Sequence, residues 1–162
     1  MTANIHASCV RLARAGRAFG APPDAGILIL GKSGAGKSEL ALRLIADGAE
    51  LVADDRVDLF LRREKLFARA PKTLAGLIEV RGVGIIELPH KKDARIALVV
   101  TLTNTKIARL PERARYEPPI KMPQNNKPPM IALSLNVATP AKIVAAVSAF
   151  AKNLFREEVK KT

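Results

Sequence analysis

Apolar and polar residues follow one another along this chain in patterns that predict both strands and helices. The run GILILG at 26–31 is apolar throughout and bounded by glycines, which is typical of a strand buried on both faces. Helical spacing of apolar residues, with Leu40 and Leu44 among them, predicts a helix over about 37–46. Gly48 is placed to end that helix. The two elements follow each other directly, so a buried strand is expected to lead through a short turn into a helix.

The same patterns predict the remaining elements. Further strands are expected at 50–53, 57–61, 65–68, 95–102 and 130–135, within 77–88 around a tight glycine turn, and as a short strand within 1–10. Thr139 is a good N-cap and Pro140 suits the first position of a second helix. Residues 11–26 are predicted to form a connection. Six of the eleven prolines fall in 104–129, which is predicted to be a long loop or lid.

Strands that alternate with helices predict an α/β fold, with a mixed β-sheet flanked by helices. A chain of 162 residues forms one ordinary domain. We assign that domain to 1–155 and expect 156–162 to be a charged C-terminal tail. No apolar run approaches the length of a membrane span, so no membrane partner is expected.

The charge balance favours an anionic partner. The chain carries 27 basic and 15 acidic residues, a formal net charge of +12. Trp is absent and aromatic residues make up 4%, too few for a base-stacking platform, so a nucleotide or an acidic protein is expected rather than nucleic acid. The single cysteine, Cys9, cannot form an internal disulfide, and residues 1–10 lack a secretory signal pattern. These features predict a cytoplasmic protein.

The strongest chemical signal is the octapeptide GKSGAGKS, which fits the P-loop pattern GxxxxGK[ST] at every position. Its residues are Gly31, Lys32, Ser33, Gly34, Ala35, Gly36, Lys37 and Ser38. The glycines let successive backbone N–H groups converge on phosphate oxygens at a helix N-terminus. Lys37 is expected to reach the β- and γ-phosphates, and the Ser38 hydroxyl is expected to help hold Mg²⁺. The motif predicts binding of a nucleotide such as ATP.

Phosphoryl transfer also needs metal ligands and a proton acceptor, and several residues are candidates. Asp54 and Asp55 end the strand at 50–53, where one can bind metal through water while the other acts as a base. Glu79 and Arg81 are expected on one face of a buried strand, as a structural ion pair or as a metal ligand with its orienting partner. His6, close to the N-terminus, is structural or catalytic on this evidence alone.

At these residues the sequence resembles the bacterial HPr kinase/phosphorylases. The resemblance rests on His6, GKSELALRLI, LVADDRV, APKTLAGLIEVRGVGII and LVVTL in that order, and covers residues 5 to about 109 well. The block at 78–87 looks like the signature of the family. Only the catalytic half of the longer family members is matched. The fold is therefore expected to be similar to the HPr kinase catalytic domain, a single P-loop kinase domain.

The resemblance implies an enzyme that uses ATP and Mg²⁺ to phosphorylate a serine of the phosphocarrier protein HPr. By matched position it implies His6 and Lys37 in the active site and Asp55 as the base that takes the serine proton. Ser38 and Glu79 would ligate Mg²⁺, and Arg109 stands where the family has a catalytic arginine. The resemblance also implies a hexamer.

Two departures from the family pattern affect these expectations. Extra residues at about 11–25 separate His6 from the P-loop, so a longer loop is expected to bring His6 back. Asn136 and Thr139 stand where the family has two arginines tied to dephosphorylation, which makes phosphorylase activity doubtful. Two other readings stay open: a P-loop small-molecule kinase or NTPase, and a non-enzymatic module in which 104–129 reports nucleotide occupancy.

Overall fold

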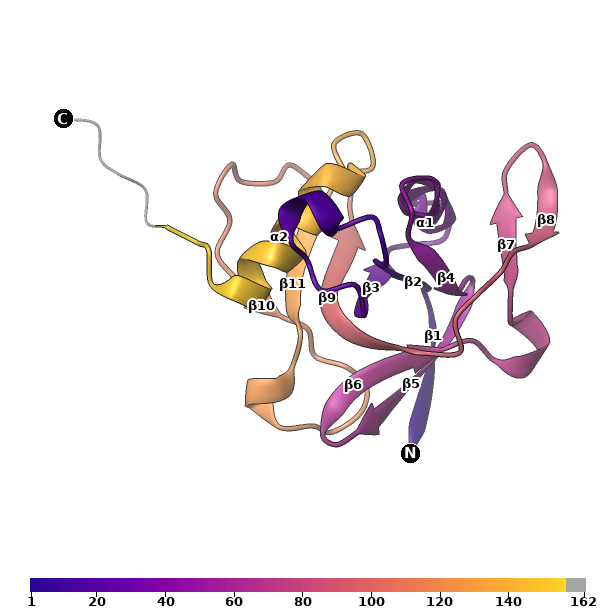
Figure 1. Ribbon diagram of the computed structural model, residues 1–162, viewed down its shortest axis with the longest axis horizontal. Helices are drawn as coiled ribbons and strands as arrows, with labels where there is room; N and C mark the ends of the chain where they lie inside the picture. The colour runs from indigo at the N-terminus through magenta and orange to yellow at the C-terminus, as the bar shows by residue number, and fades with distance from the viewer. Residues whose placement is uncertain (157–162) are drawn as a thin grey trace.

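The structure, a computed structural model, describes residues 1–156. A curled nine-stranded sheet carries two helices, and a separate two-stranded hairpin stands at one side (Figure 1). The strands are β1 (Thr2–His6), β2 (Ser8–Arg11), β3 (Ala25–Leu30), β4 (Glu50–Ala53), β5 (Arg56–Arg62), β6 (Lys65–Arg69), β7 (Leu77–Val80), β8 (Gly84–Glu87), β9 (Ala94–Leu102), β10 (Ala114–Arg115) and β11 (Pro129–Leu133). The helices are α1 (Lys37–Ala46) and α2 (Pro140–Lys152), with short 3₁₀ turns η1 (Arg17–Phe19), η2 (Lys72–Leu74) and η3 (Gln124–Asn126).

The main sheet is mixed, as predicted. Its principal strand order is β1-β5-β6-β9-β3-β2-β4, and β11 also pairs with β9. β3, β9 and β11 run parallel, whereas β5, β6 and β2 pair antiparallel with their neighbours. This mixture places the carboxyl ends of β3 and β9 at one edge of the sheet, where α/β proteins bind ligands.

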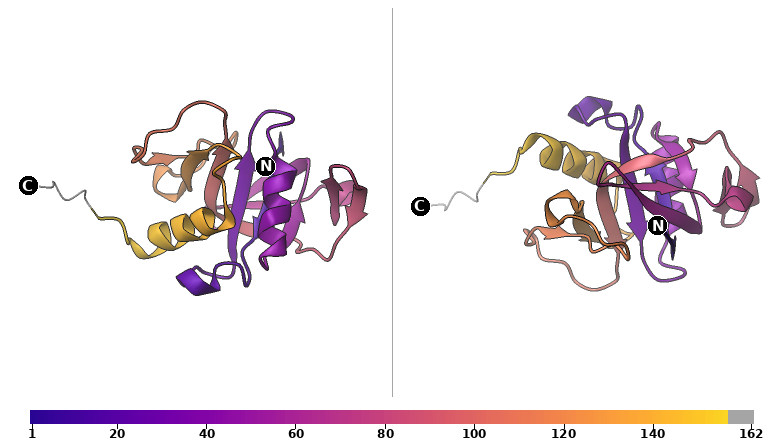
Figure 2. Two further views of the ribbon diagram at one scale, coloured as in Figure 1. Left: turned by 90° about the horizontal axis from the view of Figure 1, so that it is seen from above. Right: turned by 90° about the horizontal axis from the view of Figure 1, so that it is seen from below.

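Two hydrophobic cores lie on the two faces of the curled sheet. One joins the sheet to the inner faces of α1 and α2, which both lie on that side (Figure 2). The other lies inside the curl formed by β1, β5 and β6 and includes Ile120 and Met122. β3 serves both cores, since Ile27 and Ile29 face the helices while Leu28 faces the curl. Its all-apolar sequence follows from this double burial.

Most elements lie where the sequence predicts them, with three corrections. The first ten residues contain two strands, β1 and β2, which pair with different partners. The proline-rich stretch 104–129 is not simply a loop, because it contains β10 and η3 and buries Ile120 and Met122 in the second core. Proline removes backbone donors, but it does not prevent a segment from packing.

The third correction concerns β7, which is not a buried strand. β7 and β8 form their own two-stranded sheet (Figure 1), and Ile78 is the only buried residue of the pair. Alternation of apolar and polar residues does not reveal whether a strand joins the main sheet.

The described chain also contains no helix long and apolar enough to cross a membrane. Apart from Arg156, the predicted charged tail lies outside the described residues.

Candidate functional site

The P-loop lies at the carboxyl end of β3 and opens directly into α1, as its chemistry requires. Gly34 and Gly36 have φ angles of 80° and 101°, a region that side chains rarely adopt. A Cβ on Gly36 would lie 2.5 Å from Leu135 Cδ2, so the Leu135 side chain would have to move to admit one. The loop is thus held in its curve by both conformation and packing.

Lys37 is folded back against the P-loop itself. Its Nζ donates to the carbonyl oxygens of Gly31 and Lys32, at 2.9 Å each, and the residue is 6% exposed. Burial lowers the pKa of Lys37, and the negative charges of Asp54 and Asp55 partly oppose this shift. An ammonium has three donors, so Lys37 retains one for an incoming phosphate.

Asp54 is buried and accepts three hydrogen bonds at the site. The Ser8 and Ser38 hydroxyls donate to its Oδ1 at 2.6 and 2.7 Å, and the Glu79 amide donates to its Oδ2 at 3.2 Å. At 3% exposure, this carboxylate is held by donors from β2, α1 and β7. Because the Ser38 proton points to Asp54, the lone pairs of its Oγ remain available to a metal ion.

Asp55 points the other way, toward solvent. The tight connection from β4 to β5 gives Asp55 a φ of 69°, and its side chain is 67% exposed. Its Oδ1 lies 3.3 Å from His6 Nε2. The antiparallel register of β1 and β5 pairs His6 with Arg56, which brings His6 beside Asp55. A left-handed conformation in a residue other than glycine is often found at functional sites.

The expectation that a longer loop brings His6 back is wrong. Residues 12–24 connect β2 to β3, and the register of that pair places this connection beyond Arg11 and Gly26, at the end of β3 far from the P-loop. The connection packs against α2, where Ser148 Oγ donates to the Phe19 carbonyl at 2.6 Å. His6 reaches the site through strand pairing instead.

The P-loop, His6, Asp55 and Glu79 surround one cavity of about 590 Å³. Of the predicted site residues, its lining includes His6, Ser33, Gly34, Gly36, Lys37, Ser38, Asp55 and Glu79. Gly31, Lys32 and Ala35 belong to the same P-loop without lining the cavity, and Arg109, in the segment between β9 and β10, does not line it. The volume falls within the usual range for small-molecule sites.

The sequence analysis did not predict four other residues that line the cavity: Ser8, Glu39, Arg43 and Leu135. Arg81 also lines it, and no ion pair joins Arg81 to Glu79 in the described chain. Arg43 is held at the rim by Glu39 and by the Leu135 carbonyl. Its i,i+4 spacing from Glu39 signals a helix-surface pair, and only the approach of the β11 end to α1 shows that it borders the cavity.

The donor set fits Mg²⁺ bound together with a nucleotide. No cluster of three His, Cys, Asp or Glu side chains capable of holding a metal occurs between residues 1 and 156. Mg²⁺ is usually held by one or two carboxylates plus phosphate oxygens and waters rather than by a protein cage. Ser38 and Glu79 both line the cavity and would offer such an ion a hydroxyl oxygen and a carboxylate.

Known proteins match this chain in sequence. Residues 23–160 match the family described as HPr Serine kinase C-terminal domain. The HPr kinase/phosphorylase of Latilactobacillus sakei is 35% identical over 132 residues, covering 76% of this chain and 42% of that protein. That of Lactobacillus delbrueckii subsp. bulgaricus is 45% identical over 87 residues, 49% of this chain and 28% of that protein. The chain therefore spans less than half the length of these relatives.

A solved structure shares the fold. The Hpr(Ser) kinase/phosphatase from Coxiella burnetii superposes with a TM-score of 0.67 at 21% identity, covering 94% of this chain and 95% of that one. The predicted α/β architecture with a mixed sheet is thereby confirmed.

Proposed function

Because the chain belongs to the HPr serine kinase C-terminal domain family, we propose that it is a kinase that phosphorylates a serine of an HPr phosphocarrier with ATP and Mg²⁺. The observation that carries this proposal is the placement of Asp55 at the mouth of the P-loop cavity, solvent-exposed and 3.3 Å from His6. A carboxylate that faces outward beside a triphosphate site suits a hydroxyl brought by another protein.

The P-loop residues would bind the nucleotide. Backbone amides of 31–38 would hold the phosphate oxygens, and the remaining donor of the Lys37 ammonium would contact the β- and γ-phosphates. Ser38 and Glu79 would ligate Mg²⁺, which neutralises developing charge on the transferred group. Asp54 would hold the Ser38 hydroxyl so that its lone pairs face the metal.

Asp55 would act as the base. The acceptor serine Oγ attacks the γ-phosphorus, its proton passes to the Asp55 carboxylate, and the bond to the ADP oxygen breaks. His6 lies close enough to orient that carboxylate and to share its proton. The result is phosphoserine and ADP.

We propose that dephosphorylation by phosphorolysis is weak in this chain. Asn136 is exposed, and the Thr139 side chain is engaged as the α2 N-cap, accepting from the Lys142 amide at 3.3 Å. Neither side chain carries the positive charge that would bind an attacking phosphate. Dephosphorylation of phospho-HPr by phosphate at a rate comparable to the kinase reaction would contradict this proposal.

The catalytic role of Arg109, assembly into a hexamer and a cytoplasmic location remain proposals drawn from the family resemblance and composition. Arg109 would have to approach the cavity through movement of the segment between β9 and β10. In that position its guanidinium would stabilise charge on the moving phosphoryl group.

Incubation with purified HPr, ATP and Mg²⁺ tests the proposed function, with mass spectrometry of the acceptor. We expect one phosphate on one serine of HPr, and none when that serine is replaced by alanine or when Mg²⁺ is chelated. Turnover of ATP that is unaffected by HPr would instead favour a small-molecule kinase or NTPase. Nucleotide binding without any transfer would favour the regulatory module.

A further inference from the structure

A second cavity lies between β11, α2 and the segment 107–113 that leads into β10; we call it the β11 cavity. Its volume is about 560 Å³, close to the 590 Å³ of the nucleotide cavity, and within the usual range for small-molecule sites. The two cavities share no lining residue. The β11 cavity is therefore a separate space that the proposed phosphoryl transfer does not use.

The cavity opens where β10 stops pairing with the edge of β11. β10 pairs antiparallel with β11 at two positions, one of them Ala114 with Met130. Continuing this register would set Pro111 opposite Leu133, but proline has no backbone N–H to give to a strand ladder. From Ile131 onward, the edge of β11 away from β9 has no strand partner within residues 1–156. The preceding chain leaves the sheet edge here, and a space opens beside it.

The walls of the cavity are largely apolar and come from three parts of the chain. Segment 107–113, β11 and the C-terminal part of α2 with the residues after it supply the largest apolar side chains: Ile107, Leu110, Met130, Ile131, Phe150 and Phe155. None of these six is fully buried, and Leu110 is 59% exposed. Covering apolar surface that faces water is favourable, so an apolar group that enters this space gains free energy.

The turn after α2 fixes the aromatic part of this wall. Asn153 ends the helix in a left-handed conformation with a φ of 52°, and the Leu154 amide donates to the Ala149 carbonyl at 3.0 Å. The chain thereby returns Phe155 onto Phe150, and the two ring centroids lie 4.8 Å apart in an edge-to-face arrangement. The aromatic wall is thus held by packing within the described chain.

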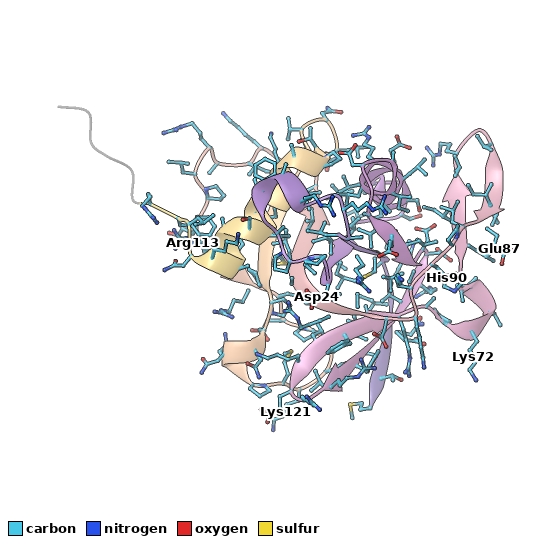
Figure 3. The ribbon with its side chains drawn as sticks, viewed as in Figure 1. Asp24, Lys72, Glu87, His90, Arg113 and Lys121 are labelled. Atoms are coloured by element: carbon cyan, nitrogen blue, oxygen red, sulfur yellow. The ribbon has the colours of Figure 1, made fainter. Side chains whose placement is uncertain are left out.

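Two guanidinium groups border the aromatic wall, and neither has a carboxylate partner within residues 1–156. Arg113 Cζ lies 4.0 Å from the centre of the Phe155 ring, and Figure 3 shows Arg113 beside the end of α2. The ring meets the face of the guanidinium, so the N–H donors at its edge stay available. Arg156 Nη1 donates to the carbonyl oxygens of Phe155 and Asn153, at 2.9 and 3.5 Å. Glu112, the one acidic residue of the described lining, pairs with neither arginine.

An apolar wall with cations at one end fits an amphiphilic anion. Guanidinium groups bind carboxylates through paired hydrogen bonds, and an alkyl chain can cover the apolar side chains. We propose that the β11 cavity binds a medium-chain monocarboxylic acid. Its carboxylate would lie at Arg113 and Arg156, and its hydrocarbon chain would lie against Ile107, Leu110 and Ile131. A compact polar anion would leave this wall uncovered.

Methyl NMR of the whole chain, labelled at isoleucine, leucine and methionine, tests this site because it reads the two cavities separately. Ile107, Met130 and Ile131 report on the β11 cavity, and Leu135 reports on the nucleotide cavity. Octanoate, 1-octanol and octylammonium are titrated in parallel as monomers. We expect saturable shifts at the first three residues and none at Leu135. Octanoate should bind about fivefold or more tighter than 1-octanol, and octylammonium should bind most weakly.

Single substitutions at exposed positions separate the charge from the wall. Arg113→Gln should weaken octanoate binding by about fivefold and leave 1-octanol binding unchanged. Arg63→Gln removes the same charge at the turn between β5 and β6, outside the cavity, and should bind both ligands as the unaltered chain does. Leu110→Ser should weaken both ligands by about threefold or more, because both use the apolar wall.

Four results would overturn the proposal. The first is an absence of saturable shifts at Ile107, Met130 and Ile131. Equal affinity for octanoate and 1-octanol would show that the arginines do not select an acid. A smaller assembly in analytical ultracentrifugation of Leu110→Ser, together with no octanoate binding to the unaltered chain, would identify an interface between copies of this chain. Binding to phosphatidylglycerol vesicles that is tighter than binding to free octanoate, and is lost in Leu110→Ser, would identify a membrane contact.

Discussion

Two adjacent aspartates, Asp54 and Asp55, differ in burial and in the groups that they contact. The tight turn after β4 directs Asp54 into the protein, where three donors hold it, and directs Asp55 outward, beside His6. A fully hydrogen-bonded buried carboxylate is suited to holding other groups in place, whereas an accessible carboxylate can exchange a proton. The turn separates the two roles that we assign to the pair.

Asp55→Asn should abolish transfer without affecting nucleotide binding. The amide keeps the size of the side chain but cannot accept the serine proton, so we expect transfer to fall by about 10²- to 10⁴-fold. Asp58→Asn removes the same charge three residues along the chain, outside the cavity lining, and serves as the control. Rapid-quench transfer and nucleotide titration are measured on both. Normal phosphorylation of HPr by Asp55→Asn would disprove the role assigned to Asp55.

Ser8→Ala tests whether Asp54 is held as the structure indicates. Loss of the 2.6 Å hydrogen bond leaves a buried charged oxygen with one donor fewer, which should destabilise the fold by about 1.5–3 kcal/mol. It should also raise the Mg²⁺ concentration needed for half-maximal transfer, since Ser38 shares that oxygen. Urea unfolding and Mg²⁺ titration measure the two effects.

Ser148→Ala is the matched control, because Ser148 is also buried and donates to a carbonyl far from the site. It should lower stability and leave the Mg²⁺ requirement unchanged. If both serine variants behave alike in the Mg²⁺ titration, Ser8 does not position the metal ligand.

At the residue scale, the sequence allowed us to predict the candidate site residues that lie within local motifs. The P-loop and the Asp-Asp pair follow an apolar strand, so their exposure at a strand end can be inferred from neighbours along the chain. Ser8 could not be identified in this way, because its partner Asp54 is 46 residues distant. Arg43 likewise borders the cavity only because the chain around Leu135 approaches α1.

At the scale of elements, helix α2 illustrates how local chemistry fixes a boundary. Thr139 has extended backbone, its side chain accepts from the Lys142 amide, and Pro140 follows at the first helical position. These are the features that predict a helix start from sequence. α2 then packs its buried residues, Ile143 and Val147 among them, against the sheet.

Thr139→Ala should lower stability by about 1 kcal/mol through loss of that cap, whereas Thr139→Ser should retain most of it. Urea unfolding of the two variants at equal conditions makes the measurement. Identical midpoints for alanine, serine and threonine would show that the cap contributes nothing to stability.

Other elements depend on contacts that sequence patterns do not encode. The pattern in 77–88 predicted two strands correctly, but it does not encode that they pair with each other and stay outside the main sheet. The division of 1–10 into β1 and β2 also depends on distant partners, β5 on one side and β3 with β4 on the other. Local sequence patterns do not specify which distant strands pair with one another.

At the scale of the whole molecule, the net charge of +12 sets up a field that attracts an acidic partner. Arg43 and Arg81 stand at the rim of the nucleotide cavity, so part of that field surrounds the site where the acceptor must arrive. Electrostatic attraction of this kind accelerates encounter more than it strengthens the final complex.

Association with HPr should therefore slow as salt is added. Raising NaCl from about 0.05 M to about 0.5 M shortens the Debye length and should reduce the association rate constant by about tenfold or more, with a smaller change in dissociation. Surface plasmon resonance or stopped-flow fluorescence measures both rates. An association rate that is independent of ionic strength would rule out electrostatic steering.

The most direct test of the account follows the γ-phosphate of ATP through a single turnover. Enzyme in excess over [γ-³²P]ATP is mixed with HPr and Mg²⁺, and label on protein and in free phosphate is counted over time. We predict that label passes to a serine of HPr at the rate at which ATP is consumed, with little released to water and little ATP consumed when HPr is omitted. Release of label as free phosphate at the same rate with and without HPr would contradict the claim that the P-loop and Asp55 form a protein kinase site.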